Sequence, residues 1–131
     1  MRILLDTHVA LWAIADDRRL PQRARKLIAD GKNSIVVSAA TIWEIAIKHA
    51  LARGKRNAMP LSGAQALKHF LAAGYETLSI SPAHAAALDS LSIRHGDPFD
   101  RILIAQALAE PLRLLTADAR IAEYSDSVIL V

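Results

Sequence analysis

The sequence predicts an α/β protein whose central sheet is largely parallel. Short apolar segments bounded by polar residues alternate along the chain with longer segments of helical character. Two apolar segments, Ile35 to Val37 and Leu112 to Leu115, show little polar alternation, which is typical of strands covered on both faces. The chain has 131 residues, so we expect residues 1–131 to form a single domain.

The apolar segments are the expected strands, and the longer segments between them are the expected helices. The strands are Arg2 to Leu5, Ser34 to Val37, Thr77 to Ile80, Arg113 to Thr116 and Val128 to Val131. The helices cover about 7–15, 21–30, 40–53, 62–73, 82–90 and 98–109.

Local signals mark several helix ends. Asp97-Pro98 places a capping side chain before a proline at the first helical position. Gly31, Gly54 and Gly74 lie where helices should end. The basic segment 53–60 is the expected exposed loop.

Composition excludes several classes of protein. The chain is 53% hydrophobic and 22% charged, which excludes a disordered protein. It has no cysteine, so disulfides, thiolate metal ligands and thiol nucleophiles are excluded. The start of the chain lacks the apolar region of a signal peptide, and no segment is apolar over a length that spans a bilayer. We therefore expect a soluble, cytoplasmic protein.

The basic side chains indicate a polyanionic partner. The net charge is +3, and if four of the 13 acids are drawn into one site, 16 basic side chains face nine acids elsewhere. One basic run consists of Arg18, Arg19, Arg23, Arg25 and Lys26, and the other of Lys48, Arg53, Lys55 and Arg56. Each run alone is typical of a solvated helix face, but together they suit a phosphate backbone.

Five acids follow predicted strands or begin predicted helices. Asp6 directly follows the first strand, and Asp118 comes two residues after the fourth. Glu44 lies early in the helix after the second strand, and Asp97 and Asp100 flank the start of the helix at 98–109. Ligands of parallel α/β sheets gather outside the carboxyl ends of the strands. We therefore expect the five side chains to reach one edge of the sheet.

Each acid also has an ordinary structural explanation. Asp6 and Asp118 would cap helices, and Glu44 would form a capping box with the threonine three residues before it. Asp97 and Asp100 would form an acidic pair at a helix start, where the helix dipole favours negative charge. Asp97 is the acid best explained as a cap alone.

The surroundings of the acids favour a metal site. The helix from Ile102 to Ala109 is apolar on nearly every side except at Gln106, so we expect it to be buried. A carboxylate near its start is costly unless it is paired or bound to a cation, and neighbouring carboxylates raise each other's pKa values. Oxygen ligands without cysteine or paired histidines favour Mg²⁺ or Mn²⁺ over Zn²⁺. The five scattered histidines are expected to be structural or exposed, and Trp12 and Trp43 to lie in the core.

Four motifs occur in order along the whole chain. They are Leu-Leu-Asp-Thr-His-Val-Ala-Leu-Trp at 4–12, Ser-Ala-Ala-Thr-Ile-Trp-Glu-Ile-Ala-Ile-Lys at 38–48, Asp-Pro-Phe-Asp-Arg-Ile-Leu-Ile-Ala-Gln-Ala at 97–107 and Leu-Thr-Ala-Asp at 115–118. The separate motifs are weak, but the ordered set is specific. Together they resemble the PIN-domain family, in particular the VapC-type ribonuclease toxins of type II toxin–antitoxin pairs.

The resemblance implies a fold, an activity and partners. The fold is a three-layer α/β/α sandwich with a central, mostly parallel sheet. The activity is Mg²⁺- or Mn²⁺-dependent endoribonuclease cleavage of single-stranded RNA, leaving a 5′-phosphate and a 3′-hydroxyl. The partners are a cognate antitoxin protein and a second copy of the chain. Leu67, Phe70 and Leu71 would serve either interface or, more commonly for such a stripe, the core.

The resemblance also assigns roles to single residues. The catalytic, metal-binding acids would be Asp6, Glu44 and Asp100, with Asp118 as the fourth and Asp97 close to the metal. The assignment of Asp100 rather than Asp97 as ligand stays open. Thr7 and Thr116 would be hydroxyls that support the ligands or contact the substrate.

Two other functions stay open from the residues alone. A haloacid-dehalogenase-type phosphatase would also place an aspartate after its first strand, as Asp6 is placed. It needs a second aspartate two residues further on, where this chain has His8. The other alternative is a non-catalytic module of the same fold that binds RNA or a partner, and the complete set of acids argues against it.

Overall fold

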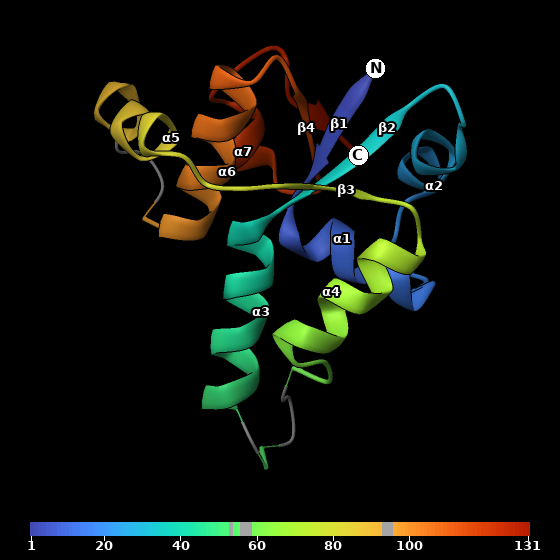
Figure 1. Ribbon diagram of the computed structural model, residues 1–131. Coiled ribbons are helices and arrows are strands. Elements are labelled where there is room, and N and C mark those ends of the chain that lie inside the picture. Colours follow the sequence, from blue (N-terminus) through green and yellow to red (C-terminus); the bar gives the residue numbers. More distant parts are fainter. Residues whose placement is uncertain (53, 56–58, 93–95) are drawn as a thin grey trace.

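A parallel sheet forms the middle layer of the molecule (Figure 1). The computed structural model describes residues 1–52, 54–55, 59–92 and 96–131. The strands are β1 (Arg2–Leu5), β2 (Ser34–Ser38), β3 (Glu76–Leu78), β4 (Arg113–Thr116) and β5 (Ile129–Leu130). Their order is β3-β2-β1-β4-β5, and each neighbouring pair is parallel. The predicted fold class is therefore confirmed.

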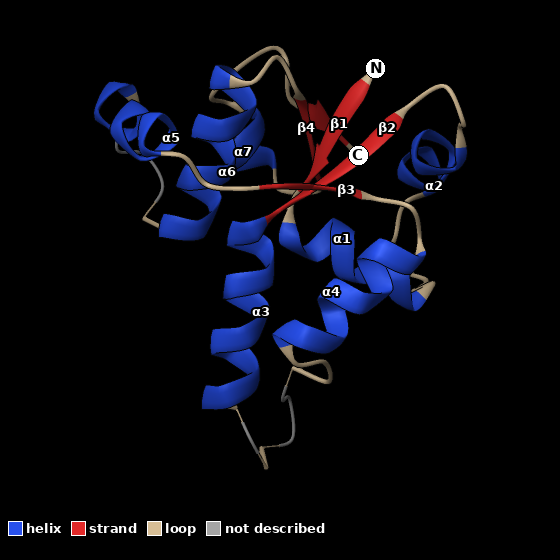
Figure 2. Cartoon of the chain, in the orientation of Figure 1, coloured by secondary structure: helices blue, strands red, loops and turns tan. Residues whose placement is uncertain are grey.

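Helices connect the strands, as Figure 2 shows. They are α1 (Thr7–Ala15), α2 (Gln22–Ala29), α3 (Ala39–Leu51), α4 (Gly63–Ala72), α5 (Pro82–Ala86), α6 (Pro98–Ala109) and α7 (Ala119–Ala122). The predicted helix at 98–109 coincides with α6. The predicted helix at 82–90 is divided, because α5 is followed by a 3₁₀ turn over Ala87–Ser90. The short helix α7 is additional to the predicted set.

A hydrophobic cluster covers each face of the sheet. Ile3 and Leu5 of β1 belong to the cluster that holds buried residues of α1, α2 and α4. Leu4, between them, belongs to the cluster that holds α6 and α7. Neighbouring side chains of a strand point to opposite faces, so β1 contributes to both cores and the predicted three layers are present.

The apolar segments divide between core and surface. The prediction that the helix after Ile102 is buried is confirmed, since residues 102–107 are all buried. Phe70 is fully buried, whereas Leu71 is 55% exposed. The predicted core position of Trp43 is wrong, because its side chain is 55% exposed. Trp12 is half-buried and packs against the α1 side of the core.

Some predictions fall outside what the structure describes. The basic residues Arg53 and Arg56, the middle of the loop at 53–60 and His95 lie outside the described residues. In the part of the chain that is described, no helix is both long and apolar enough to cross a membrane.

Candidate active site

The five predicted acids line one cavity. It has a volume of about 320 Å³ and lies at the carboxyl edge of the sheet. Its lining includes Asp6, Glu44, Asp97, Asp100 and Asp118. Asp6 and Asp118 follow β1 and β4, Glu44 lies in the second turn of α3, and Asp97 and Asp100 lie at the start of α6. Parallel strands bring them together although they are spread over most of the chain.

Asp6 is the most deeply placed of the aspartates. Its side chain caps α1 by accepting the Val9 N–H at 2.8 Å, so the capping interpretation is correct. The Thr116 hydroxyl at the end of β4 donates to its other carboxylate oxygen. Only 3% of Asp6 is exposed, and burial raises the pKa of its carboxyl. The charge of Asp100 acts in the same direction, whereas the two hydrogen bonds and His8 oppose the shift.

Glu44 is buried to the same degree and is held from two sides. The Thr7 hydroxyl donates to Oε1 at 2.7 Å, and the Lys48 ammonium donates to Oε2 at 2.5 Å. Thr7 is in turn 3.2 Å from the Thr41 hydroxyl. The predicted capping box of Glu44 is wrong, because Ser38 caps α3 and Glu44 points into the cavity.

Asp97 and Asp118 each combine a cap with a place in the cavity, whereas Asp100 lines the cavity from the first turn of α6. Asp97 caps α6 by accepting the N–H groups of Phe99 at 2.8 Å and Asp100 at 3.2 Å. Asp118 caps α7 by accepting the Arg120 N–H at 2.9 Å. A cap and a cavity position are compatible because a helix N-terminus directs its first side chains toward the same edge.

Arg120 is a cavity residue that the sequence prediction missed. Its guanidinium pairs with both carboxylate oxygens of Asp118, at 3.2 and 3.0 Å. This contact raises the pKa of Arg120, and the charges of Asp100 and Asp97 raise it further. The available signal was its place two residues after a capping aspartate. Arg120 thus supplies positive charge beside a cluster of carboxylates.

The chemistry of these donors fits a hard divalent cation. The cavity is lined by carboxylate oxygens. The negative charge of Asp100 repels that of the buried Asp6, and a bound cation would relieve this repulsion. Among the described residues, no three acids or histidines are arranged as a ready-made metal site. Glu44 is engaged by Lys48 and Asp118 by Arg120. These contacts partly neutralise the two acids and compete with a cation for their oxygens.

The fold and the cavity define a class: parallel α/β proteins with an acidic site at the carboxyl edge of the sheet. The sequence matches the PIN domain over residues 3–127, and the chain belongs to this family. The family and the resemblance predicted from the motifs therefore agree, and the phosphatase alternative is rejected.

Known relatives share most of the length of the chain. Ribonuclease VapC22 of Mycobacterium tuberculosis is 33% identical over 123 residues, which are 93% of this chain and 91% of the relative. Among solved structures, VapBC2 from Rickettsia felis bound to a promoter DNA fragment contains a chain with a TM-score of 0.68 and 18% identity, covering 100% of this chain and 98% of that one. A toxin–antitoxin complex from Klebsiella pneumoniae gives a TM-score of 0.64 at 17% identity, with 97% and 95% coverage.

Proposed function

We propose that this chain is a single-domain, metal-dependent endoribonuclease that cleaves single-stranded RNA in the cytoplasm, as the toxin of a toxin–antitoxin pair. The observation that carries the proposal is the cavity in which Asp6, Glu44, Asp97, Asp100 and Asp118 meet. Membership of the PIN-domain family and the 33% identity to a ribonuclease support it.

The mechanism assigns Mg²⁺ or Mn²⁺ to the carboxylates. Asp6, Glu44 and Asp100 would hold the ion, with Asp118 as a fourth ligand and Asp97 close by. When bound, the ion neutralises charge on the phosphate oxygens and lowers the pKa of an attacking water.

The protein's own contribution is orientation. Thr116 fixes one oxygen of Asp6, and Thr7 fixes one oxygen of Glu44, so the two buried carboxylates have defined directions. Because both hydroxyls are buried, they support the acids rather than reach the substrate. Arg120 is 70% exposed at the side chain and carries a charge that can attract the phosphate backbone.

Cleavage is tested with the purified protein and a labelled single-stranded RNA. We expect cutting with Mg²⁺ or Mn²⁺, no cutting with EDTA, and loss of cutting in Asp6→Asn without loss of the folded circular dichroism spectrum. Asp126→Asn is the matched control, because it changes an exposed aspartate outside the cavity. Full activity of Asp6→Asn would disprove the mechanism, and an inactive wild type would favour a non-catalytic binding module.

The toxin role rests on the family and is tested in cells. Expression of the wild-type chain should arrest bacterial growth, and Asp6→Asn should not. A small gene beside the natural gene should encode the antitoxin and restore growth. Harmless expression of active protein would instead indicate a stand-alone ribonuclease.

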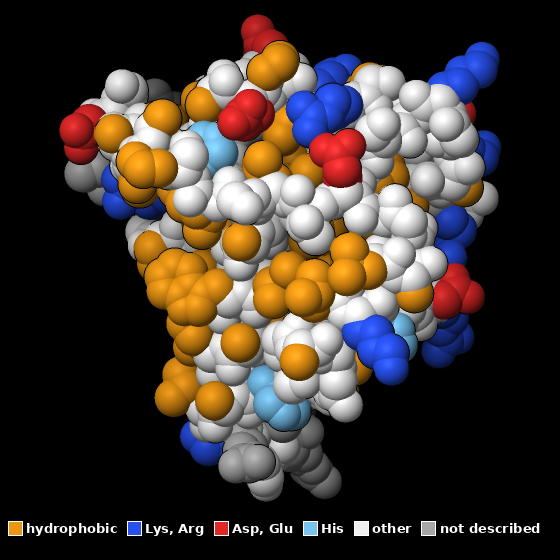
Figure 3. All heavy atoms as spheres, viewed as in Figure 1, with side chains coloured by type: hydrophobic (Ala, Val, Ile, Leu, Met, Phe, Trp, Pro, Cys, Tyr) orange, Lys and Arg blue, Asp and Glu red, His pale blue; other side chains and the backbone are white. Residues whose placement is uncertain are grey.

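A homodimer is supported by exposed apolar side chains on α3. Trp43 is 55% exposed and Leu51 is 73% exposed. They are eight positions apart, so they lie on the same face of the helix, and Phe99 packs edge-on against Trp43 at 5.0 Å. Hydrophobic side chains gather along this flank of the molecule (Figure 3).

The dimer is tested by substitution on that face. In sedimentation experiments, Trp43→Glu should shift a dimer toward the monomer, whereas Leu108→Glu, which changes an exposed leucine of α6, should not. A wild-type protein that sediments as a monomer would disprove the dimer.

A further inference from the structure

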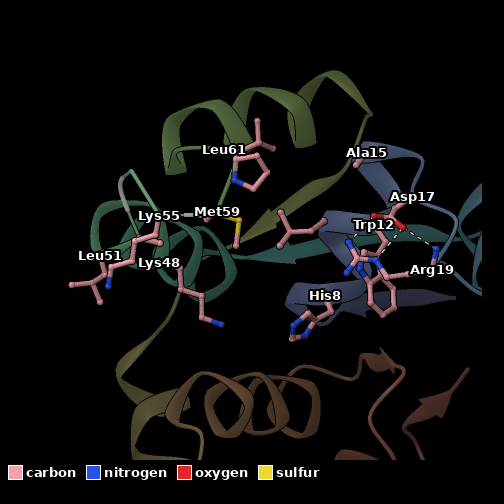
Figure 4. Close-up of a pocket in the computed structure, with 13 residues that line it drawn as sticks. His8, Trp12, Ala15, Asp17, Arg19, Lys48, Leu51, Lys55, Met59 and Leu61 are labelled. Carbon is pink, nitrogen blue, oxygen red and sulfur yellow. Dashed lines mark hydrogen bonds and ion pairs between the residues drawn. The ribbon is translucent and has the colours of Figure 1, made fainter. Parts of the chain in front are cut away.

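A second, larger cavity lies beside the acidic one. Its volume is about 620 Å³, and residues of α1, α3 and the segment before α4 line it (Figure 4). His8 lines both cavities. Lys48 lines the larger cavity and donates to Glu44 of the smaller one. The two cavities are therefore neighbours along one surface.

An aromatic ring and a guanidinium form a fixed unit in this cavity. The Arg19 guanidinium lies 5.6 Å from the centre of the Trp12 ring. Asp17 holds it at two points, with Arg19 Nε at 3.1 Å and Nη2 at 2.8 Å from its carboxylate oxygens. Arg19 lowers the pKa of the Asp17 carboxyl to about 2, so this pair is charged across the pH range of most enzymes. The guanidinium plane is thereby oriented beside the indole (Figure 4).

The charge of the lining is mainly positive. Arg19, Lys48 and Lys55 are cations, whereas Asp17 is the acid among the described lining residues. Apolar groups such as Leu61 complete the walls. Single-stranded RNA presents flat bases and a chain of phosphates, which bind to aromatic rings and guanidinium planes and to basic side chains respectively.

We propose that this cavity binds the RNA segment next to the phosphate that is cut, with one nucleobase stacked on the Trp12–Arg19 unit and a backbone phosphate facing Lys55. The inference rests on the proposed function, since it names the substrate contact of the same active site. Asp17 acts as a positioning residue, because it touches Arg19 rather than the RNA.

Binding is measured separately from cutting. The protein carries Asp6→Asn and is kept in EDTA, and the probe is a short fluorescein-labelled single-stranded RNA followed by anisotropy. Adding Trp12→Leu should weaken binding by about 10-fold, the order of effect expected for one lost stacking contact. Trp12→Phe keeps a ring and should bind within about 3-fold of the parent.

Asp17→Asn gives the sharper test. It removes a negative charge from the cavity, so simple electrostatics predicts tighter RNA binding. Loss of the second oxygen that holds Arg19 predicts weaker binding, and this is the result we expect. For the phosphate contact, Lys55→Gln should weaken binding and reduce its salt dependence more than Lys32→Gln, which changes a lysine in the turn before β2.

The possible results distinguish a failure of the nucleobase site from a failure of the proposed ribonuclease activity. In cleavage-competent protein, Trp12→Leu should raise KM by about 10-fold and leave kcat within about 3-fold. Unchanged binding in Trp12→Leu together with tighter binding in Asp17→Asn would overturn the nucleobase site and favour a protein partner in this cavity. If Trp12→Leu fails to fold, the RNA affinity of Asp17→Asn tests the proposal alone: weaker binding supports the nucleobase site and tighter binding overturns it. An inactive wild type that still binds RNA through these residues would disprove the proposed catalysis but not this site.

Discussion

Asp6→Asn separates the structural role of Asp6 from its proposed role as a metal ligand. Asparagine caps helices about as well as aspartate, so the Val9 N–H keeps its acceptor. The new amide can donate to the Thr116 hydroxyl, which donates to Asp6 in the wild type. Asp6→Ala loses both contacts. A missing cap costs about 1 kcal/mol and a missing buried hydrogen bond about 1 kcal/mol, so Asp6→Ala should be about 2 kcal/mol less stable than Asp6→Asn.

The charge adds a pH dependence to this comparison. Burial raises the folded-state pKa of Asp6 above its ordinary value of 3.8. The ionised carboxylate therefore destabilises the metal-free fold once the pH exceeds the unfolded pKa. In EDTA at neutral pH, Asp6→Asn should therefore have a higher free energy of unfolding than the wild type, apart from the other effects of the substitution. This difference should disappear as the pH falls below 3.8.

Thermal unfolding followed by circular dichroism measures each effect. In EDTA, roughly 6–10 °C should separate the Tm of Asp6→Asn from that of Asp6→Ala. Mg²⁺ at about 100 times its Kd should stabilise the wild type by about 2.7 kcal/mol and Asp6→Asn much less. If Asp6→Asn has the same Tm as Asp6→Ala, the capping argument is wrong. If Mg²⁺ raises the Tm of Asp6→Asn as much as that of the wild type, Asp6 is not a ligand.

Three further predictions concern the scaffold and the larger cavity. Phe70→Ala should lower the free energy of unfolding by about 3–5 kcal/mol in urea, because Phe70 is fully buried. Gly63→Ala should cost about 1–3 kcal/mol, since the new methyl carbon would lie 2.9 Å from Cβ of Ala46, and adding Ala46→Gly should restore most of the loss. In NMR titrations the Asp17 carboxyl should titrate at about 2, and Arg19→Gln should move its pKa up toward 3.8; an unchanged value would show that Arg19 does not hold it.

Local signals predicted the elements where they were complete. The predicted limits of α6 are those of the structure, because Asp97-Pro98 fixes its start and the helix is buried on most sides. The strands at the two edges of the sheet, β3 and β5, are shorter than predicted. An edge strand pairs on one side, so its length depends on a partner that its own sequence does not reveal.

The sequence predicted the acids that line the cavity, but not which side chains form hydrogen bonds with them. Asp6 follows a strand and Asp100 lies at the start of a helix, and the neighbouring residues in the sequence predict both positions. The contact of Thr7 with Glu44 joins residues 37 positions apart, so it depends on the packing of α1 against α3. Trp43 shows the limit of hydrophobicity as a signal. On a mostly apolar helix, every apolar residue is predicted to lie in the core. The sequence does not show whether the face that carries it packs in the core or is exposed to solvent.

The position of β1 in the middle of the sheet has a consequence for synthesis of the protein. β1 is synthesised before the other strands of the sheet, yet it lies between β2 and β4. Thr116 at the end of β4 is 110 positions from the Asp6 that it orients. A growing chain that has not reached β4 lacks both this hydroxyl and Asp118. Its acids cannot form the complete cavity before β4 and Asp118 have emerged. For the proposed ribonuclease, made among the RNAs of its own cell, we expect this strand order to delay cutting until β4 and α7 have been synthesised.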